Sequence, residues 1–124
     1  MHVAIIDDDP MELEILKGLS ADIAPDMAFH GFASLDAFCK ARDRASFDAV
    51  FLDRRINAYT DFNETLPKIA ASGFQGPVVL QTARVMGMPD QYRGLTLIGP
   101  VDKFDLLEPD RLSAILDKVC DAVT

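Results

Sequence analysis

The apolar residues of the chain gather in five short runs, and stretches with a helical pattern lie between those runs. A short run that is apolar on both of its faces is typical of a strand in a parallel sheet that helices cover on both sides. The alternation of such strands with helices predicts a doubly wound α/β domain. The expected strands are Val3–Ile6, Met27–Ala33, Asp48–Asp53, Pro77–Leu80 and Leu95–Val101.

The length of the chain limits how many domains it can form. A chain of 124 residues has room for one hydrophobic core, so we expect a single domain over residues 1–124 with no output domain. We expect five parallel strands in the flavodoxin-like order 2-1-3-4-5, with helices on both faces of the sheet.

The first expected helix has clear start and stop signals. Asp9 is a good N-cap, Pro10 suits the first helical position, and Glu12 would complete a capping box. Pro25 stops the helix, which is therefore expected to end at about Ile23.

The other helical stretches are less uniform. Helices are expected over Ser34–Arg42 and over Asp61–Gly73, the second with a capping box at its start and a kink or a late start at Pro67. Residues 83–94 lie where the alternation requires a helix, but two glycines and a proline interrupt them, so we expect a short or irregular fourth helix. The last helix begins near Pro109, and its apolar residues follow the i, i+3, i+4, i+7 spacing.

The charge of the chain disfavours some partners and points to one region. With 12 basic and 20 acidic residues the net charge is −8, which disfavours binding to nucleic acids and to anionic membranes. Residues 1–39 contain eight acidic residues and one basic residue, so this segment alone carries −7. Because the excess negative charge is concentrated in this one segment, we expect a specific feature of the segment to require it.

The remaining features of the composition favour a cytoplasmic location. Cys39 and Cys120 form no metal or redox motif, and we expect them to be small buried hydrophobic residues in a reducing compartment. His2 and His30 are far apart in the sequence, and nothing pairs them as ligands. The first residues do not resemble a signal peptide, and no apolar run reaches the length of a membrane span.

Four of the expected strands lead into chemically active side chains. In a parallel α/β sheet, ligands bind beyond the carboxyl ends of the strands. The first strand leads into the acidic run Asp7–Asp9, and later strands lead to Asp53, Thr82 and Lys103. Crowded carboxylates repel one another, and Mg²⁺, which binds carboxylates together with waters and phosphate oxygens, would remove that conflict.

This set of groups suits phosphoryl transfer. The Asp53 carboxylate can attack phosphorus as a nucleophile and form an acyl phosphate. Mg²⁺, the Lys103 ammonium and the Thr82 hydroxyl would stabilise the charge on the transferring oxygens. Each residue alone also has an ordinary structural explanation, as a helix cap, a strand end, a turn residue or a surface lysine. Their joint placement at strand ends favours a site.

From Val3 to Val119, the residues and their spacings resemble the receiver domain of two-component response regulators. In that family a histidine kinase or a histidine phosphotransfer protein donates a phosphoryl group to one aspartate. The resemblance implies that Asp53 is this phosphoacceptor. It also implies that Asp7 and Asp8 hold Mg²⁺ with Asp53, and that the backbone carbonyl of Arg55 is a further contact to the metal.

The resemblance assigns roles to three residues around the phosphoryl group as well. Thr82 corresponds to the hydroxyl residue that moves toward the phosphoryl group, and Ala83 to the small residue after it. Lys103 corresponds to the lysine that pairs with the acyl phosphate.

The chain departs from the family pattern around this lysine. Family members usually have a proline after it, joined by a cis bond, whereas Phe104 follows Lys103 in this chain. The aromatic residue that often precedes the lysine is absent, and residues 83–94, in the place of the fourth helix, have little helical character. These departures leave the phosphorylation motif intact and affect the regions through which the family signals.

Two pairs of residues flank the expected site. Arg55 and Arg84 lie two residues beyond Asp53 and Thr82, where they would either shield the acyl phosphate or simply be solvated. Met11 and Ile15 lie at the flank of the apolar stripe of the first helix, near the site. They are expected to be peripheral core or part of a docking patch for the helical bundle of a kinase.

The resemblance implies a signalling domain that acts by protein–protein contact as a switch, a relay or a phosphate sink, and not an enzyme with a substrate of its own. One alternative is a degenerate receiver that serves as a phosphorylation-independent adaptor, which the Lys103–Phe104 junction suggests. Another is a small Mg²⁺-dependent phosphatase of the haloacid-dehalogenase type, with Asp7 as nucleophile and Asp9 as acid and base. Pro10 and the lack of room for a cap domain disfavour it.

Overall fold

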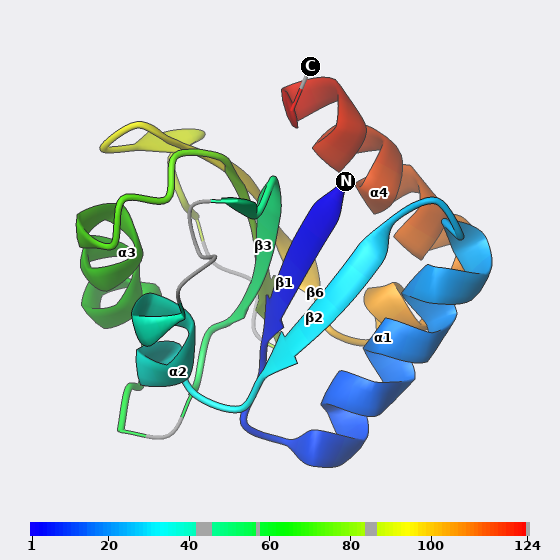
Figure 1. Ribbon diagram of the computed structural model, residues 1–124, viewed down its shortest axis with the longest axis horizontal. Helices are drawn as coiled ribbons and strands as arrows, with labels where there is room; N and C mark the ends of the chain where they lie inside the picture. Colours follow the sequence, from blue (N-terminus) through cyan, green and yellow to red (C-terminus); the bar gives the residue numbers. More distant parts are fainter. Residues whose placement is uncertain (42–45, 57, 84–86, 124) are drawn as a thin grey trace.

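The protein folds as the predicted doubly wound α/β domain, with a sheet between two pairs of helices (Figure 1). The computed structural model describes residues 1–41, 46–56, 58–83 and 87–123. The strand order is β2-β1-β3-β4-β6-β5, and all but β5 run parallel, in the predicted order. The strands are β1 (His2–Ile6), β2 (Ala28–Phe32), β3 (Ala49–Asp53), β4 (Pro77–Thr82), β5 (Gln91–Tyr92) and β6 (Leu95–Asp102).

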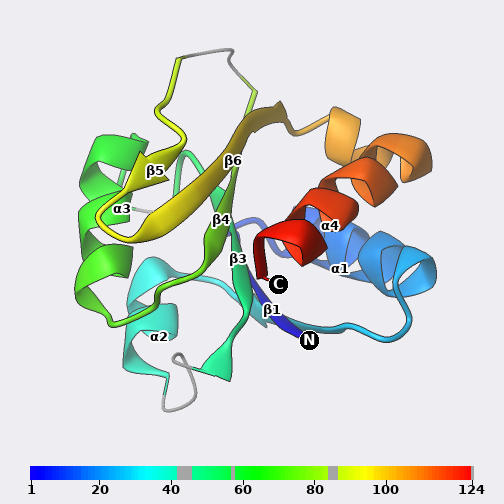
Figure 2. The ribbon, with the colours of Figure 1, turned by 90° about the horizontal axis from the view of Figure 1, so that it is seen from above.

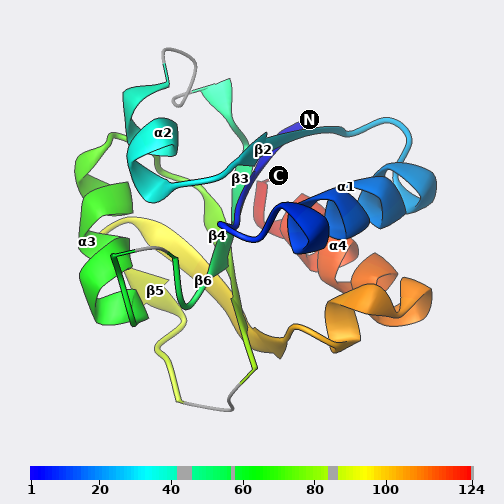
Figure 3. The same ribbon diagram turned by 90° about the horizontal axis from the view of Figure 1, so that it is seen from below.

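The helices form two layers. Helices α1 and α4 cover one face of the sheet, and α2 and α3 cover the other (Figure 2 and Figure 3). A short 3₁₀ helix, η2, connects β6 to α4 and contacts α1. The bounds are α1 (Pro10–Ile23), α2 (Leu35–Lys40), α3 (Phe62–Ala71), η2 (Asp105–Leu107) and α4 (Pro109–Val123).

Each face of the sheet has its own hydrophobic core. This confirms the prediction from the sequence, in which the expected strands are apolar on both of their faces. Within β3, Val50 and Leu52 join the core beneath α2 and α3, whereas Ala49 and Phe51 join the core beneath α1 and α4. This alternation follows the two-residue period of a strand. The central strands are therefore fixed on both sides, which holds their carboxyl ends in place.

The two predicted helix starts differ in one detail. Asp9 caps α1 as expected, because its Oδ1 accepts hydrogen bonds from the backbone N–H groups of Met11 and Glu12. Glu12 does not complete a capping box, since the Asp9 N–H already donates to Asp7 Oδ1 at 2.9 Å. At α3 the capping box of Asp61 and Glu64 is present.

Helix α3 runs through Pro67 from Phe62, so the late start considered from the sequence is wrong. The short helix expected within residues 83–94 is also absent from its described part, residues 83 and 87–94. Strand β5 lies there instead and pairs antiparallel with β6. The two residues that join these strands, Arg93 and Gly94, both have positive φ, at 46° and 88°, as a type I′ hairpin turn requires. The side chains of Met88 and Tyr92 pack against the core on this side.

An irregularity in β6 sets the position of its carboxyl end. The register shifts by one residue, so that Val79 pairs with Ile98 but Gln81 pairs with Val101. Gly99 lies in this bulge with a φ of 106°, and the Gly99–Pro100 peptide bond is cis. It is the one cis peptide bond among the described residues. The Lys103–Phe104 bond, which corresponds to the cis bond after the lysine in family members, is therefore trans.

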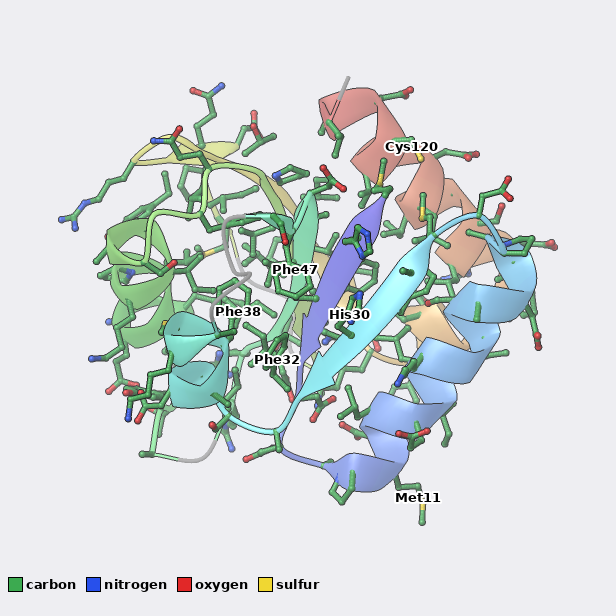
Figure 4. All side chains as sticks on the ribbon, in the orientation of Figure 1. Met11, His30, Phe32, Phe38, Phe47 and Cys120 are labelled. Atoms are coloured by element: carbon green, nitrogen blue, oxygen red, sulfur yellow. The ribbon has the colours of Figure 1, made fainter. Side chains whose placement is uncertain are left out.

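The histidines and cysteines that the sequence leaves isolated have defined surroundings in the structure. His2 and His30, which are far apart in the sequence, are neighbours across β1 and β2, where His2 Nδ1 lies 3.0 Å from His30 Nε2. The His30 ring also packs against Phe47, beside Phe32 and Phe38 (Figure 4). Cys39 and Cys120 form no disulfide, as expected, but they are only partly buried, so the expectation that they are buried hydrophobic residues is wrong.

Within the described ranges, none of the helices combines the length and the apolar character needed to cross a membrane.

The bulge provides a test of the fold. A Cβ on Gly99 would lie 2.7 Å from Val101 N and 2.9 Å from Leu80 O, in a backbone conformation that disfavours L side chains. We expect Gly99→Ala to lower the free energy of unfolding by about 2 kcal/mol. The matched control is Gly18→Ala on exposed α1, where a Cβ meets nothing within 4 Å and where alanine should stabilise by about 0.5–1 kcal/mol. Urea unfolding measures both, and equal effects of the two substitutions would show that the bulge does not require glycine.

Candidate functional site

The candidate site lies where the carboxyl ends of four parallel strands meet. Asp7 follows β1, Asp53 ends β3, Thr82 ends β4 and Lys103 follows β6. The backbone N–H of Lys103 donates to the carbonyl of Thr82 at 3.1 Å, so the register that the Gly99 bulge sets also fixes the lysine at this edge. The structure thus brings these four side chains to one edge of the sheet.

Lys103 is the centre of the polar contacts at this edge. Its Nζ donates to Asp53 Oδ2 at 2.7 Å and to Glu12 Oε2 at 2.9 Å. Asp53 is 3% exposed, and its carboxylate is therefore held by the ammonium in a nearly solvent-free position. A charge-assisted hydrogen bond of this kind orients the carboxylate oxygen.

Asp7, Glu12 and Asp53 form a carboxylate cluster. One oxygen atom from each lies within 4.8 Å of the others. Asp7 is 3% exposed, and its Oδ1 accepts from the Asp9 N–H, which fixes the orientation of this carboxylate. Oxygen donors at this density suit Mg²⁺, which prefers carboxylates and retains several waters.

The pKa values reflect this crowding. Burial and the neighbouring Asp53 carboxylate raise the pKa of Asp7 to about 7, against an opposing contribution from the Asp9 N–H. Burial also raises the pKa of Asp53, although its hydrogen bond with Lys103 limits the shift. Burial lowers the pKa of the Lys103 ammonium, but its bonds to Asp53 and Glu12 outweigh this and raise the pKa overall. A cation at this position would relieve the cost of ionising both aspartates.

A cavity of about 270 Å³ adjoins Asp53 on one side. Thr82 is 4% exposed and lines this cavity with Ala83, Lys103 and the two arginines that follow Asp53. The cavity is where a phosphoryl group on Asp53 would meet a hydroxyl group and cationic side chains.

The residues that follow Asp53 fix the loop below this cavity. The Arg54 N–H donates to the Gln81 carbonyl at 2.9 Å, and the Arg54 guanidinium pairs with Asp61 at 3.3 Å. Asp61 therefore both caps α3 and anchors this arginine. The exposed residue Arg55 donates its backbone N–H to the Asp53 carboxylate, which lowers the pKa of that group against the effect of burial. Arg84 lies outside the described residues.

The structure places Asp8 differently from the other expected metal ligands. The side chain of Asp8 is exposed and does not belong to the carboxylate cluster. The third carboxylate of the cluster is that of Glu12, whose sequence position indicated only a helix cap. The signal for it in the sequence is weak, namely an acidic residue in the first turn of a helix that begins at the site edge.

A second cavity, of about 220 Å³, lies on the α1 side of Lys103. Its polar wall contains Gln81, which no motif in the sequence indicated, together with Asp7 and Glu12. Its apolar wall comes from α1 and the η2 region, and consists of Leu16, Phe104, Leu106 and Leu107.

Several solved structures that resemble this chain are described as receiver domains or response regulators. A CheY-like receiver domain from Methylobacillus flagellatus matches with a TM-score of 0.69 and 16% identity, over 96% of this chain and 98% of that one. A response regulator from Colwellia psychrerythraea matches with a TM-score of 0.67 and 19% identity, over 97% and 96% of the two chains. The N-terminal domain of an uncharacterized protein from Wolinella succinogenes matches with a TM-score of 0.69 and 20% identity, over 98% and 94%.

No family model matches the sequence, and no curated protein gives a significant match to it. The structural matches establish that the chain has the receiver-domain fold, as the sequence motif implied.

The raised pKa of Asp7 predicts a pH-dependent stability. The folded-state pKa is about 7 and the ordinary value is 3.8, so the folded protein binds the proton more tightly and loses stability as the pH rises between them. In metal-free buffer, Asp7→Asn should match the wild type near pH 4 and exceed its free energy of unfolding by about 4 kcal/mol at pH 8. Asparagine retains Oδ1 for the Asp9 N–H. Urea unfolding across this pH range measures the difference, and a variant less stable than the wild type at pH 8 would contradict it.

Proposed function

We propose that the protein is a response-regulator receiver that accepts a phosphoryl group on Asp53 in a Mg²⁺-dependent reaction. The donor would be the phosphohistidine of a histidine kinase or of a histidine phosphotransfer protein. The observation that carries the proposal is the buried Asp53 carboxylate, held at 2.7 Å by Lys103 and beside Asp7 at the carboxyl edge of a receiver-type sheet.

The residues of the site suit the transfer step. An Asp53 oxygen attacks phosphorus while the bond between phosphorus and the imidazole nitrogen breaks, and the nitrogen leaves with the electron pair of that bond. Lys103 and the Thr82 hydroxyl lie around the cavity next to Asp53 and would hold the phosphoryl oxygens. Asp7 and Asp53 would hold Mg²⁺, for which Asp8 and the Arg55 carbonyl are further candidates by resemblance. When bound, the cation supplies positive charge to the transferring oxygens.

The acyl phosphate would act through protein–protein contacts in the cytoplasm. With the hairpin β5–β6 in the place of the fourth helix, the surface through which the family usually signals has a different shape. This supports a role as a relay or a phosphate sink beside that of a switch.

The phosphatase alternative has little support in the geometry. In that alternative Asp9 would be the general acid and base, but in the structure it is the N-cap of α1. Its carboxylate accepts hydrogen bonds from two backbone N–H groups there. The adaptor alternative differs from our proposal in one outcome, which is whether Asp53 is phosphorylated.

The test of the proposal is phosphorylation by a small donor. We expect acetyl phosphate with Mg²⁺ to add one acid-stable, base-labile phosphoryl group, which peptide mass spectrometry locates on Asp53. Asp53→Asn should lose the modification, and Asp36→Asn, an exposed aspartate on α2, should retain it. Absence of any adduct with every donor would favour the adaptor, and an adduct on Asp7 would favour the phosphatase.

An exposed apolar patch beside the site supports docking of a helical partner. Met11 and Phe104 are 72% and 73% exposed, and Ile15 and Leu107 are also exposed. Met11 projects into solvent from the start of α1 (Figure 4). The patch (Met11, Ile15, Phe104 and Leu107) spans α1 and the η2 region, which contact each other next to Lys103. This placement fits the helical bundle that carries a kinase's phosphohistidine.

Substitutions in this patch should separate docking from chemistry. Phe104→Ser is expected to slow phosphoryl transfer from a phosphorylated sensor-kinase bundle by about tenfold, because the partner loses an apolar anchor. The rate with acetyl phosphate, which needs no docking surface, should be unchanged. Stopped-time phosphorylation assays with both donors measure this. Equal slowing with both donors would show that the substitution damages the site itself.

A further inference from the structure

Glu12 is an exposed residue at the start of a helix, yet its side chain makes a long-range contact with the candidate site. It lies in the first turn of α1, five residues beyond Asp7, and its Oε2 accepts from Lys103 Nζ at 2.9 Å. That bond joins residues 91 positions apart in the sequence. The Glu12 carboxylate is therefore directed toward the carboxyl edge of the sheet, although the side chain is 46% exposed.

The charge balance around Glu12 is unequal. Three carboxylates, those of Asp7, Glu12 and Asp53, face the Lys103 ammonium. When all four groups are ionised they leave an excess of two negative charges, which one divalent cation neutralises. At the distances in the cluster, Coulomb repulsion among the carboxylates is large enough to favour such a cation.

Gln81 gives a second and independent indication of a ligand in the same place. Its side chain is 3% exposed and lines the cavity that Asp7, Glu12 and Lys103 also line. Within the described part of the chain, Gln81 Nε2 has no hydrogen-bond partner. A buried amide normally has one, and a water held in the cavity would supply it. Mg²⁺ keeps several of its waters when it binds to protein carboxylates.

We propose that Glu12 supplies a further protein carboxylate of the divalent-cation site, beside those of Asp7 and Asp53. The inference rests on the proposed function and adds a residue that the family resemblance does not assign. One carboxylate oxygen of Glu12 lies within 4.8 Å of a carboxylate oxygen of Asp7 and of Asp53. Before a cation binds, Lys103 neutralises part of the charge of Glu12 and Asp53.

The test is a calorimetric Mg²⁺ titration of the unphosphorylated protein. Glu12→Gln keeps the size of the side chain but removes its charge, and we expect it to weaken Mg²⁺ binding by about tenfold or more. The matched control is Glu14→Gln, an exposed glutamate on the same helix, for which we expect a change within about twofold. Mn²⁺ binding followed by electron paramagnetic resonance provides a second readout, and circular dichroism verifies that each variant is folded.

The outcomes separate this inference from the function on which it rests. A change within about twofold for Glu12→Gln, or a loss for Glu14→Gln as large as that for Glu12→Gln, would overturn the role of Glu12 while the wild type still binds Mg²⁺. A wild-type protein that binds neither Mg²⁺ nor Mn²⁺ would instead contradict the Mg²⁺ dependence of the proposed function.

Discussion

The repulsion among carboxylates at one edge of the sheet is the constraint that shapes the site. Asp7 and Asp53 are nearly buried, and Glu12 closes the cluster from α1. Lys103 compensates for part of this charge, and burial still raises the pKa values of both aspartates. Burying these carboxylates close together is unfavourable for folding, but it creates a position where a divalent cation and a phosphoryl group could bind next to each other.

The rest of the domain keeps these groups in position. The central strands are packed on both faces, so their carboxyl ends cannot drift relative to one another. The bulge at Gly99 brings β6 into the register that places Lys103 opposite Thr82. The cap at Asp9, whose N–H holds Asp7, starts α1 directly at the site. The stability of distant packing is in this way coupled to the geometry of Asp53 and its partners.

The sequence was informative where one strong pattern determined the structure. Asp53 and Lys103 could be assigned to the site edge because each follows an apolar strand, and the direction of a parallel sheet brings such ends together. Glu12 could not be assigned to the site, because the sequence predicts that its side chain accepts a hydrogen bond from the Asp9 N–H in a capping box. In the structure this N–H donates to Asp7 instead, which leaves the Glu12 carboxylate available for Lys103. The hairpin β5–β6 was not predicted, because the alternation of strands and helices predicted a helix at this place. The turn at Arg93–Gly94 is evident only from the positive φ angles of these two residues in the structure.

The most direct measurement of the central claim is thermal unfolding of the wild-type protein at pH 8 in rising Mg²⁺, compared with NaCl of equal ionic strength. If the carboxylate cluster is a divalent-cation site, Mg²⁺ above its dissociation constant should raise the midpoint in proportion to the logarithm of its concentration, by about 10 °C at a hundred times that constant, and NaCl should not. Equal shifts with both salts would show that the charge of the cluster is only screened, and would contradict the assignment of a divalent-cation site.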